Sequence, residues 1–185
     1  MSKKITILDM TYIAMSTVII TICSWISIPT AVPFTLQTFG VFLVVAVLGG
    51  KRGTLAVLVY LLLAAIGIPV LAEFTGGLGI MLGMTGGYIF GFIFSALVMW
   101  LMERLLGRKR WVLAVSMVLG LLVCYAFGTV WYIFYFANTP DAVGLWTALV
   151  WCVFPYVIPD IVKIVCALLI YKKLAVILKI EGKQS

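Results

Sequence analysis

Long apolar runs separated by short polar or charged segments make up most of the chain between residues 10 and 170. A helix that crosses a lipid bilayer needs about 20 mostly apolar residues. We predict six such helices, over residues 10–28, 38–49, 53–68, 83–102, 111–136 and 145–170. The second run is short for an upright crossing, so its helix either begins within residues 34–37 or lies sheltered by its neighbours. The pattern predicts an all-α integral membrane protein in which residues 1–185 form a single domain.

Composition indicates the same class and excludes several kinds of chemistry. Of the 185 residues, 65% are hydrophobic and only 10% are charged, whereas about 25% are charged in a typical soluble domain. The chain has no histidine, which excludes Ser–His–Asp catalysis, HExxH zinc sites and His-ligated haem. Its four cysteines stand singly, without CxxC spacing. We therefore predict that the protein is not an enzyme and has neither a metal site nor a cofactor of its own.

The distribution of basic residues predicts the orientation of the helices. With six spans, twelve of the thirteen basic residues fall on the side that holds both termini. The opposite side carries only Glu73 and Asp141. Because basic loops remain in the cytoplasm, we expect both termini to be cytoplasmic. This topology explains the net charge of +7 without a nucleic-acid partner, and it makes the lipid bilayer the main surrounding of the chain.

The thirteenth basic residue, Lys163, lies inside the sixth predicted span, three residues after Asp160. This i, i+3 spacing puts both side chains on one face of a helix, and charges at such depth face the protein interior or a cavity. Pro155 and Pro159 remove backbone donors nearby, so we expect a kink or a helix start just before the pair. The two charges either form an ion pair that fixes helix packing, or they bind a polar solute or a proton.

A glycine-rich segment, residues 74–88, is the second candidate site. It holds six glycines among fifteen residues, but it matches neither a dinucleotide-binding fingerprint nor a P-loop. It is either a flexible lid whose backbone approaches a ligand or a simple turn. Gln37, at the outer mouth of the second predicted span, is an amide that needs hydrogen-bond partners if it is buried.

Small residues form two stripes at helical spacing. Gly83, Gly87, Gly91 and Ser95 recur every four residues and predict close packing of another helix. A comparable stripe in the first span consists of Ala14, Thr17 and Thr21. That stripe faces either an internal neighbour or a partner protein.

Taken together, these motifs resemble those of the BioY family, the biotin-specific S components of energy-coupling-factor (ECF) transporters. The resemblance covers about residues 12–173. It rests on VPFTLQ at 32–37, LGGKRG at 48–53, GIPV at 67–70, GGLG at 76–79, TGGYIFGF at 85–92 and PDIVK at 159–163.

The resemblance implies the S-component fold of six helices, with a vitamin pocket that opens outward. The protein would sit in a prokaryotic cytoplasmic membrane, capture biotin outside and release it inward. Its partners would be an ECF transmembrane coupling subunit and two ATPase subunits, with ATP bound only on those partners. The alternatives are an S component for another small vitamin and a stand-alone proton-coupled carrier.

The resemblance also implies roles for particular residues. Asp160 would accept from an N–H of the biotin ureido ring, and Lys163 would donate to an oxygen. Further substrate contacts are expected at Tyr88, Phe74, Gln37, Thr85 and Gly77. Docking on the partner would involve the stripe of Ala14, Thr17 and Thr21.

Overall fold

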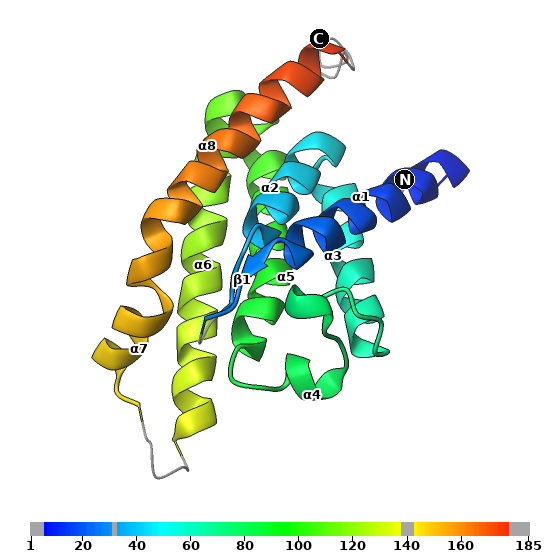
Figure 1. Ribbon diagram of the computed structural model, residues 1–185. Coiled ribbons are helices and arrows are strands. Elements are labelled where there is room, and N and C mark those ends of the chain that lie inside the picture. The colour runs from blue at the N-terminus through cyan, green and yellow to red at the C-terminus, as the bar shows by residue number, and fades with distance from the viewer. Residues whose placement is uncertain (1–5, 31–32, 138–142, 178–185) are drawn as a thin grey trace.

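The computed structural model describes residues 6–30, 33–137 and 143–177, and these residues form a bundle of helices (Figure 1). In Figure 1, α5, α6 and α8 run along the length of the molecule, and α1 is steeply inclined to them. The longer helices are α1 (Ile7–Trp25), α2 (Gln37–Leu48), α3 (Gly50–Ala65), α5 (Gly86–Leu106), α6 (Arg110–Phe136) and α8 (Phe154–Ile177). The short elements are β1 (Ser27–Ile28), β2 (Phe34–Thr35), η1 (Ala72–Phe74), α4 (Leu78–Met81) and α7 (Leu145–Cys152). Strands β1 and β2 pair antiparallel.

Four described helices, α1, α5, α6 and α8, are long and apolar enough to cross a membrane. Helix α2 has 12 residues and α3 has 16, and the two are joined at Gly49, whose φ of 84° suits glycine. Helix α2 begins at Gln37 and packs against α1, α3, α5 and α8. Both alternatives given for this short helix therefore hold: it begins within residues 34–37, and its neighbours shelter it.

The predicted span over residues 145–170 consists of two helices, α7 and α8, with a break near its start. Helix α7 ends at Cys152, and Val153 adopts φ −122° and ψ −59° before α8 begins at Phe154. Pro155 then lies in the first turn of α8, where a missing N–H costs little. Pro159 lies inside the helix. A helix start just before the charged pair was expected, and the break at Val153 confirms it.

Helices α5 and α6 approach closely along the stripe of small residues. A Cβ atom added to Gly87 would lie 2.2 Å from Trp131 Cβ, and one added to Gly91 would lie 2.7 Å from Cys124 Sγ. Ser95 Oγ donates to the carbonyl of Gly120 over 2.6 Å. The prediction that this stripe packs against another helix is confirmed.

The stripe in α1 has a different environment from the docking surface expected for it. Thr17 is buried, and its hydroxyl donates to the carbonyls of Ile13 and Ala56, the latter in α3. Thr21 is also buried and donates to the carbonyl of Thr17. Both threonines thus face the chain's own interior, because α3 covers this side of α1. Ala14 is exposed and stays a candidate for docking.

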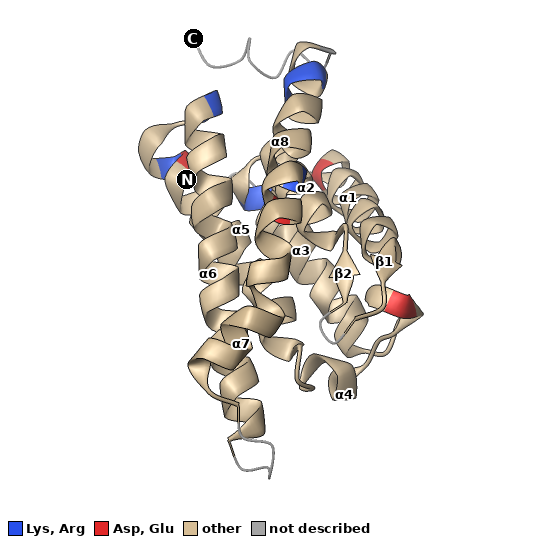
Figure 2. Ribbon diagram, turned by 60° about the vertical axis from the view of Figure 1, so that its left-hand side comes forward, with Lys and Arg blue, Asp and Glu red and all other residues tan. Residues whose placement is uncertain are grey.

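Lys and Arg gather toward the end of the molecule that holds the α5–α6 turn and the end of α8 (Figure 2). At this end Glu103 Oε2 accepts from the N–H of Gly50 over 2.6 Å, which caps the start of α3. The guanidinium of Arg108 donates to the carbonyls of Ala46 and Val47 at the end of α2. Two side chains near the α5–α6 turn therefore hold the α2–α3 hairpin in place.

Candidate binding pocket

A cavity of about 360 Å³ lies between the helices. The segments that line it include the starts of α2 and α5 and residues 71–85, whereas the α5–α6 turn and the end of α8 do not line it. Pockets for small molecules usually enclose about 300–1,000 Å³. Its wall combines the start of α2, the loop before it, residues 71–85, and parts of α5, α6, α7 and α8. The charged side chains that line it are Glu73, Asp160 and Lys163. The rest of the wall is mostly apolar and aromatic, which suits a small, mainly apolar ligand.

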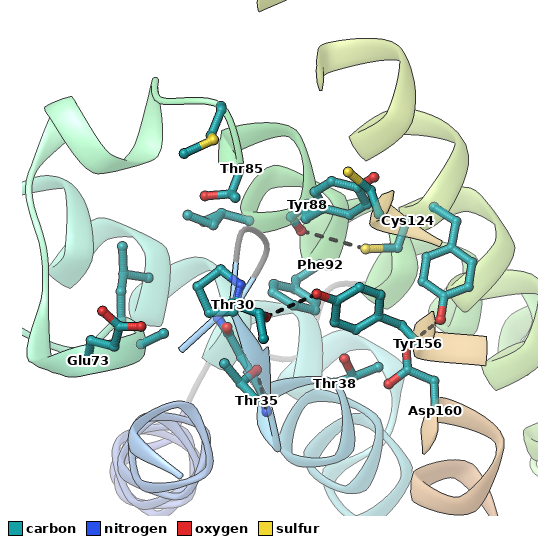
Figure 3. Close-up of a pocket in the computed structure, with 18 of the residues that line it drawn as sticks. Thr30, Thr35, Thr38, Glu73, Thr85, Tyr88, Phe92, Cys124, Tyr156 and Asp160 are labelled. Atoms are coloured by element: carbon teal, nitrogen blue, oxygen red, sulfur yellow. Dashed lines mark hydrogen bonds between the residues drawn. The ribbon is translucent and has the colours of Figure 1, made fainter. Parts of the chain in front are cut away.

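Asp160 and Lys163 form the polar centre of this pocket. Figure 3 shows Asp160 among the residues that line it. Lys163 Nζ donates to Asp160 Oδ1 over 2.7 Å, and the two side chains are 7% and 5% exposed. Tyr125 of α6 donates its hydroxyl to the other oxygen, Oδ2, over 2.5 Å. Lys163 Nζ also lies 4.3 Å from the centroid of the Phe34 ring, within the range of a cation–π contact.

The paired carboxylate keeps capacity for a ligand. Each oxygen of an ionised carboxylate can accept two hydrogen bonds, and in the described structure one donor is seen at each oxygen of Asp160. A charge-paired carboxylate lining a pocket is thus a ready acceptor for an N–H of a bound molecule.

The β1–β2 hairpin is connected to α8 across the pocket. The rings of Phe34 and Tyr156 stack with centroids 6.0 Å apart. Thr30 Oγ1 and the Tyr156 hydroxyl lie 3.2 Å apart, as Figure 3 shows. Tyr156 and Phe34 therefore bring the loop between α1 and α2 to the same side of the pocket as Asp160.

Gln37 belongs to a buried hydrogen-bond network. Its Nε2 donates to the Tyr60 hydroxyl over 2.8 Å. That hydroxyl lies 3.2 Å from Ser24 Oγ and 3.1 Å from the carbonyl of Val70. The network joins α1, α2, α3 and the segment that leads into η1, and so fixes the amide of Gln37 at the pocket wall.

Tyr88 is fixed by α6. Its hydroxyl lies 3.3 Å from Thr129 Oγ1. Gly128 lies directly under the ring, since a Cβ there would be 2.2 Å from Tyr88 Cδ1. Cys124 Sγ donates to the Tyr88 carbonyl over 3.6 Å. The absence of a side chain at Gly128 therefore allows the ring to lie against α6 beside the pocket.

Comparison with known families shows the family of the chain. The model of the BioY family matches residues 1–179. The chain belongs to the BioY family. Among its relatives, the biotin transporter BioY of Thermotoga maritima is 45% identical over 159 residues, which are 85% of this chain and 90% of that protein. The biotin transporter BioY of Rhodobacter capsulatus is 38% identical over 151 residues, covering 78% of this chain and 79% of that protein.

A solved structure has the same fold as this BioY family member. It is described as the S-component for biotin from an ECF-type ABC transporter, in a crystal structure at 2.1 Å. The two chains share 27% sequence identity with a TM-score of 0.81, over 94% of each chain. The family and its named relatives are transport proteins, not enzymes.

Of the seven substrate contacts expected from the sequence, the structure of this BioY family member brings five to one cavity. They are Gln37, Thr85, Tyr88, Asp160 and Lys163. Phe74 does not line it: its side chain is 63% exposed and its ring lies 4.9 Å from the ring of Trp25. Gly77 lies just before α4 with φ 96°, and its N–H donates to the carbonyl of Ala64 over 2.7 Å. The position expected for Phe74 is therefore corrected, and Gly77 belongs to the segment beside the pocket.

Three aromatic residues of the pocket wall were missed from the sequence, namely Phe92, Tyr125 and Tyr156. Phe34 was missed as well; its ring contacts Lys163 and Tyr156. Phe34 lies within the motif at residues 32–37, which was an available signal. Tyr125 shares its apolar run with other hydroxyl groups, including Thr129 and Tyr132, so the sequence offered no signal that singles it out.

Glu73 and Phe74 have a backbone conformation that is rare for residues with side chains. Both have φ 56°, in the left-handed region. Such conformations persist only where the surrounding structure holds them. Trp25 contributes, because its Nε1 donates to the carbonyl of Pro69 over 2.9 Å while its ring contacts Phe74. The segment over the pocket is thus held against α1.

Proposed function

We propose that this protein is the biotin-binding S component of an ATP-driven ECF importer. The observation that carries the proposal is the paired Asp160 and Lys163 on the wall of a cavity that is otherwise mostly apolar and aromatic. The family to which the chain belongs includes proteins named biotin transporters. A pocket with one fixed polar centre fits biotin, which has a polar ureido ring joined to an apolar bicycle and alkyl tail.

In the proposed complex, Asp160 accepts from a ureido N–H and Lys163 donates to the ureido oxygen. The side chains of Tyr88, Phe92 and Tyr156 line the same cavity and would pack against the bicycle. Gln37 and Thr85 would be further polar contacts. The tail carboxylate would lie away from Glu73, since two negative charges at the pocket wall repel. We propose that the segment around Gly77 acts as a lid over the site.

We infer that all six longer helices contribute to the membrane domain and that both termini are cytoplasmic. The concentration of Lys and Arg at the end that holds the α5–α6 turn supports this orientation. The pocket is lined by the starts of α2 and α5, away from the α5–α6 turn, so it would open to the outside. The protein would then reside in a prokaryotic cytoplasmic membrane.

We propose that release of biotin inward requires an ECF transmembrane coupling subunit and two ATPase subunits. The exposed apolar face of α1 supports α1 as the docking helix; it includes Met15, Val18, Ile19 and Ile22. Ala14 is exposed on the same helix and would lie in this contact. Energy would come from ATP bound on the partners.

The proposal is tested by isothermal titration of the detergent-purified protein with biotin, after removal of any co-purified vitamin. We expect one-to-one binding of biotin, with no heat from riboflavin or thiamine. Binding of another vitamin in place of biotin would overturn the substrate. Biotin uptake by cells that express this chain without any coupling module, at the rate seen with it, would overturn the ATP-driven mechanism.

A further inference from the structure

The vitamin pocket has a second charged region besides the pair on α8. Asp160 and Lys163 are paired over 2.7 Å, and the proposed contacts with the ureido ring use them. Glu73 of η1 lines the same cavity. Figure 3 shows Glu73 and Asp160 on opposite sides of the group of lining residues. A ligand held at Asp160 by its ring can therefore extend its tail toward Glu73.

The carboxylate of Glu73 is without a partner among the residues that the structure describes. No described lysine or arginine pairs with it. The one cation on the described wall of the cavity is Lys163, which is engaged by Asp160. The hydroxyl of Thr75 donates to the carbonyl of Ala72 over 2.8 Å instead. Because Glu73 is exposed, water solvates its carboxylate, and the carboxylate is open to a cationic group of a ligand.

The backbone at Glu73 would suit glycine better than a residue with a side chain. Its φ is 56° and its ψ is 30°, in the left-handed region where a Cβ atom crowds the backbone. Glycine adopts this conformation at a lower cost. Strained residues of this kind cluster at ligand sites. A glutamate in this conformation on a cavity wall indicates that its side chain has a use that glycine could not serve.

The wall around Glu73 is apolar. Leu71, Ala72, Ile80 and Met84 line this part of the cavity, and such a surface suits an alkyl tail. A tail that ends in a carboxylate is repelled by Glu73. A tail that ends in an ammonium group presents three donors to it and forms a charge-assisted hydrogen bond. The charge at this end of the cavity therefore matches a cationic tail.

We propose that Glu73 selects the tail of the ligand, and that the pocket also binds biotin amides whose tail carries an ammonium group. The inference rests on the proposed function, because it takes the ureido ring to be held at Asp160. Amide formation removes the tail carboxylate that Glu73 repels, and the ammonium group pairs with Glu73. Biotin joined to one nitrogen of a diamine belongs to this class. Biotin itself still binds, with its carboxylate turned away from Glu73.

The test is calorimetric titration of the whole detergent-purified chain with three ligands. They are biotin and two biotin amides of equal length, N-(2-aminoethyl)biotinamide with a cationic tail and N-(2-hydroxyethyl)biotinamide with a neutral tail. Glu73→Gln removes the charge and nearly keeps the size of the side chain. Glu73→Gly removes the charge and relieves the backbone. Asp9→Asn, which removes the same charge from a carboxylate that does not line the cavity, is the control.

We expect the wild type and Asp9→Asn to bind the aminoethyl amide about 2–5-fold more tightly than the hydroxyethyl amide, the range for an exposed ion pair. Added salt should reduce this preference. Both Glu73 variants should bind the two amides equally, and should bind biotin at least as tightly as the wild type does. Melting temperature and elution volume show that each variant is folded, and Glu73→Gly should melt no lower than the wild type.

Equal binding of the two amides by the wild type would overturn the inference, and so would a preference that persists in Glu73→Gln. Failure of both amides to bind where biotin binds would also overturn it. An equal loss of preference in Asp9→Asn would do the same, since the ligand would then respond to net charge alone. In each of these cases biotin binds and the proposed function stands. A folded wild type that binds none of the three ligands would overturn the proposed function, and the inference with it.

Discussion

Replacing Asp160 with Asn should weaken biotin binding strongly while it keeps the size of the side chain. The substitution removes the negative charge that Lys163 contacts over 2.7 Å and Tyr125 over 2.5 Å. A hydrogen bond to a charged group contributes about 1.5–3 kcal/mol, so the loss of one to a ureido N–H raises the Kd about 10–150-fold.

The same substitution also affects folding. The Lys163 side chain is 7% exposed, and breaking a buried ion pair by removing one partner costs about 3–5 kcal/mol. Affinity must therefore be measured on protein shown to be folded. The double variant Asp160→Asn/Lys163→Met removes both charges, so we expect it to recover stability without recovering affinity.

The assay is calorimetric titration beside size-exclusion elution and thermal melting. Asp9→Asn is the control, because Asp9 is also a carboxylate in an ion pair, with the more exposed Arg52 over 2.6 Å, and it does not line the pocket. We expect this control to keep the affinity of the wild type. A folded Asp160→Asn variant with unchanged Kd would refute the proposed role of Asp160. So would an equal loss of affinity in Asp9→Asn.

Three further changes test other parts of the pocket. Tyr125→Phe should raise the Kd for biotin about 2–12-fold, because a hydrogen bond of about 0.5–1.5 kcal/mol that orients Asp160 is lost. Calorimetric titration measures this Kd. A Kd equal to that of the wild type would show that Asp160 needs no support from α6. Gly128→Ala should lower the melting temperature and weaken biotin binding, because its Cβ would lie 2.2 Å from Tyr88, a clash that costs about 1–3 kcal/mol. Gly144→Ala, which has no heavy atom within 4 Å of the new Cβ, is its control, and equal melting of the two variants would contradict the packing argument. Gly77→Val should slow biotin entry and exit in stopped-flow fluorescence, since its φ of 96° disfavours a β-branched residue; unchanged rates would rule out a lid at this segment.

The membrane class and several local features could be predicted because each depends on residues close together in the chain. The i, i+3 spacing put Asp160 and Lys163 on one helix face, and the structure pairs them over 2.7 Å. The prolines predicted a helix start before the pair, and α8 begins at Phe154. The small stripe in α5 predicted a close helix, and α6 lies there.

The partners of the charged pair could not be predicted in this way. Tyr125 reaches Asp160 from a separate helix, and Phe34 reaches Lys163 from a strand of the β1–β2 hairpin. Each contact depends on how α6 and the hairpin are rotated relative to α8. The position of Phe74 could not be predicted for the same reason. Its ring contacts Trp25 instead of lining the pocket, and this depends on how the loop lies against α1.

Hydropathy and helical periodicity are properties of neighbouring residues, so the order of amino acids was enough to assign this chain to a membrane, to locate its charges and to group residues on helix faces. The packing of the helices was needed to learn that Thr17 and Thr21 face the interior beside α3 and that the last apolar run breaks at Val153. It also decided which aromatic side chains surround Asp160, because contacts between distant segments are set by the crossing and rotation of whole helices.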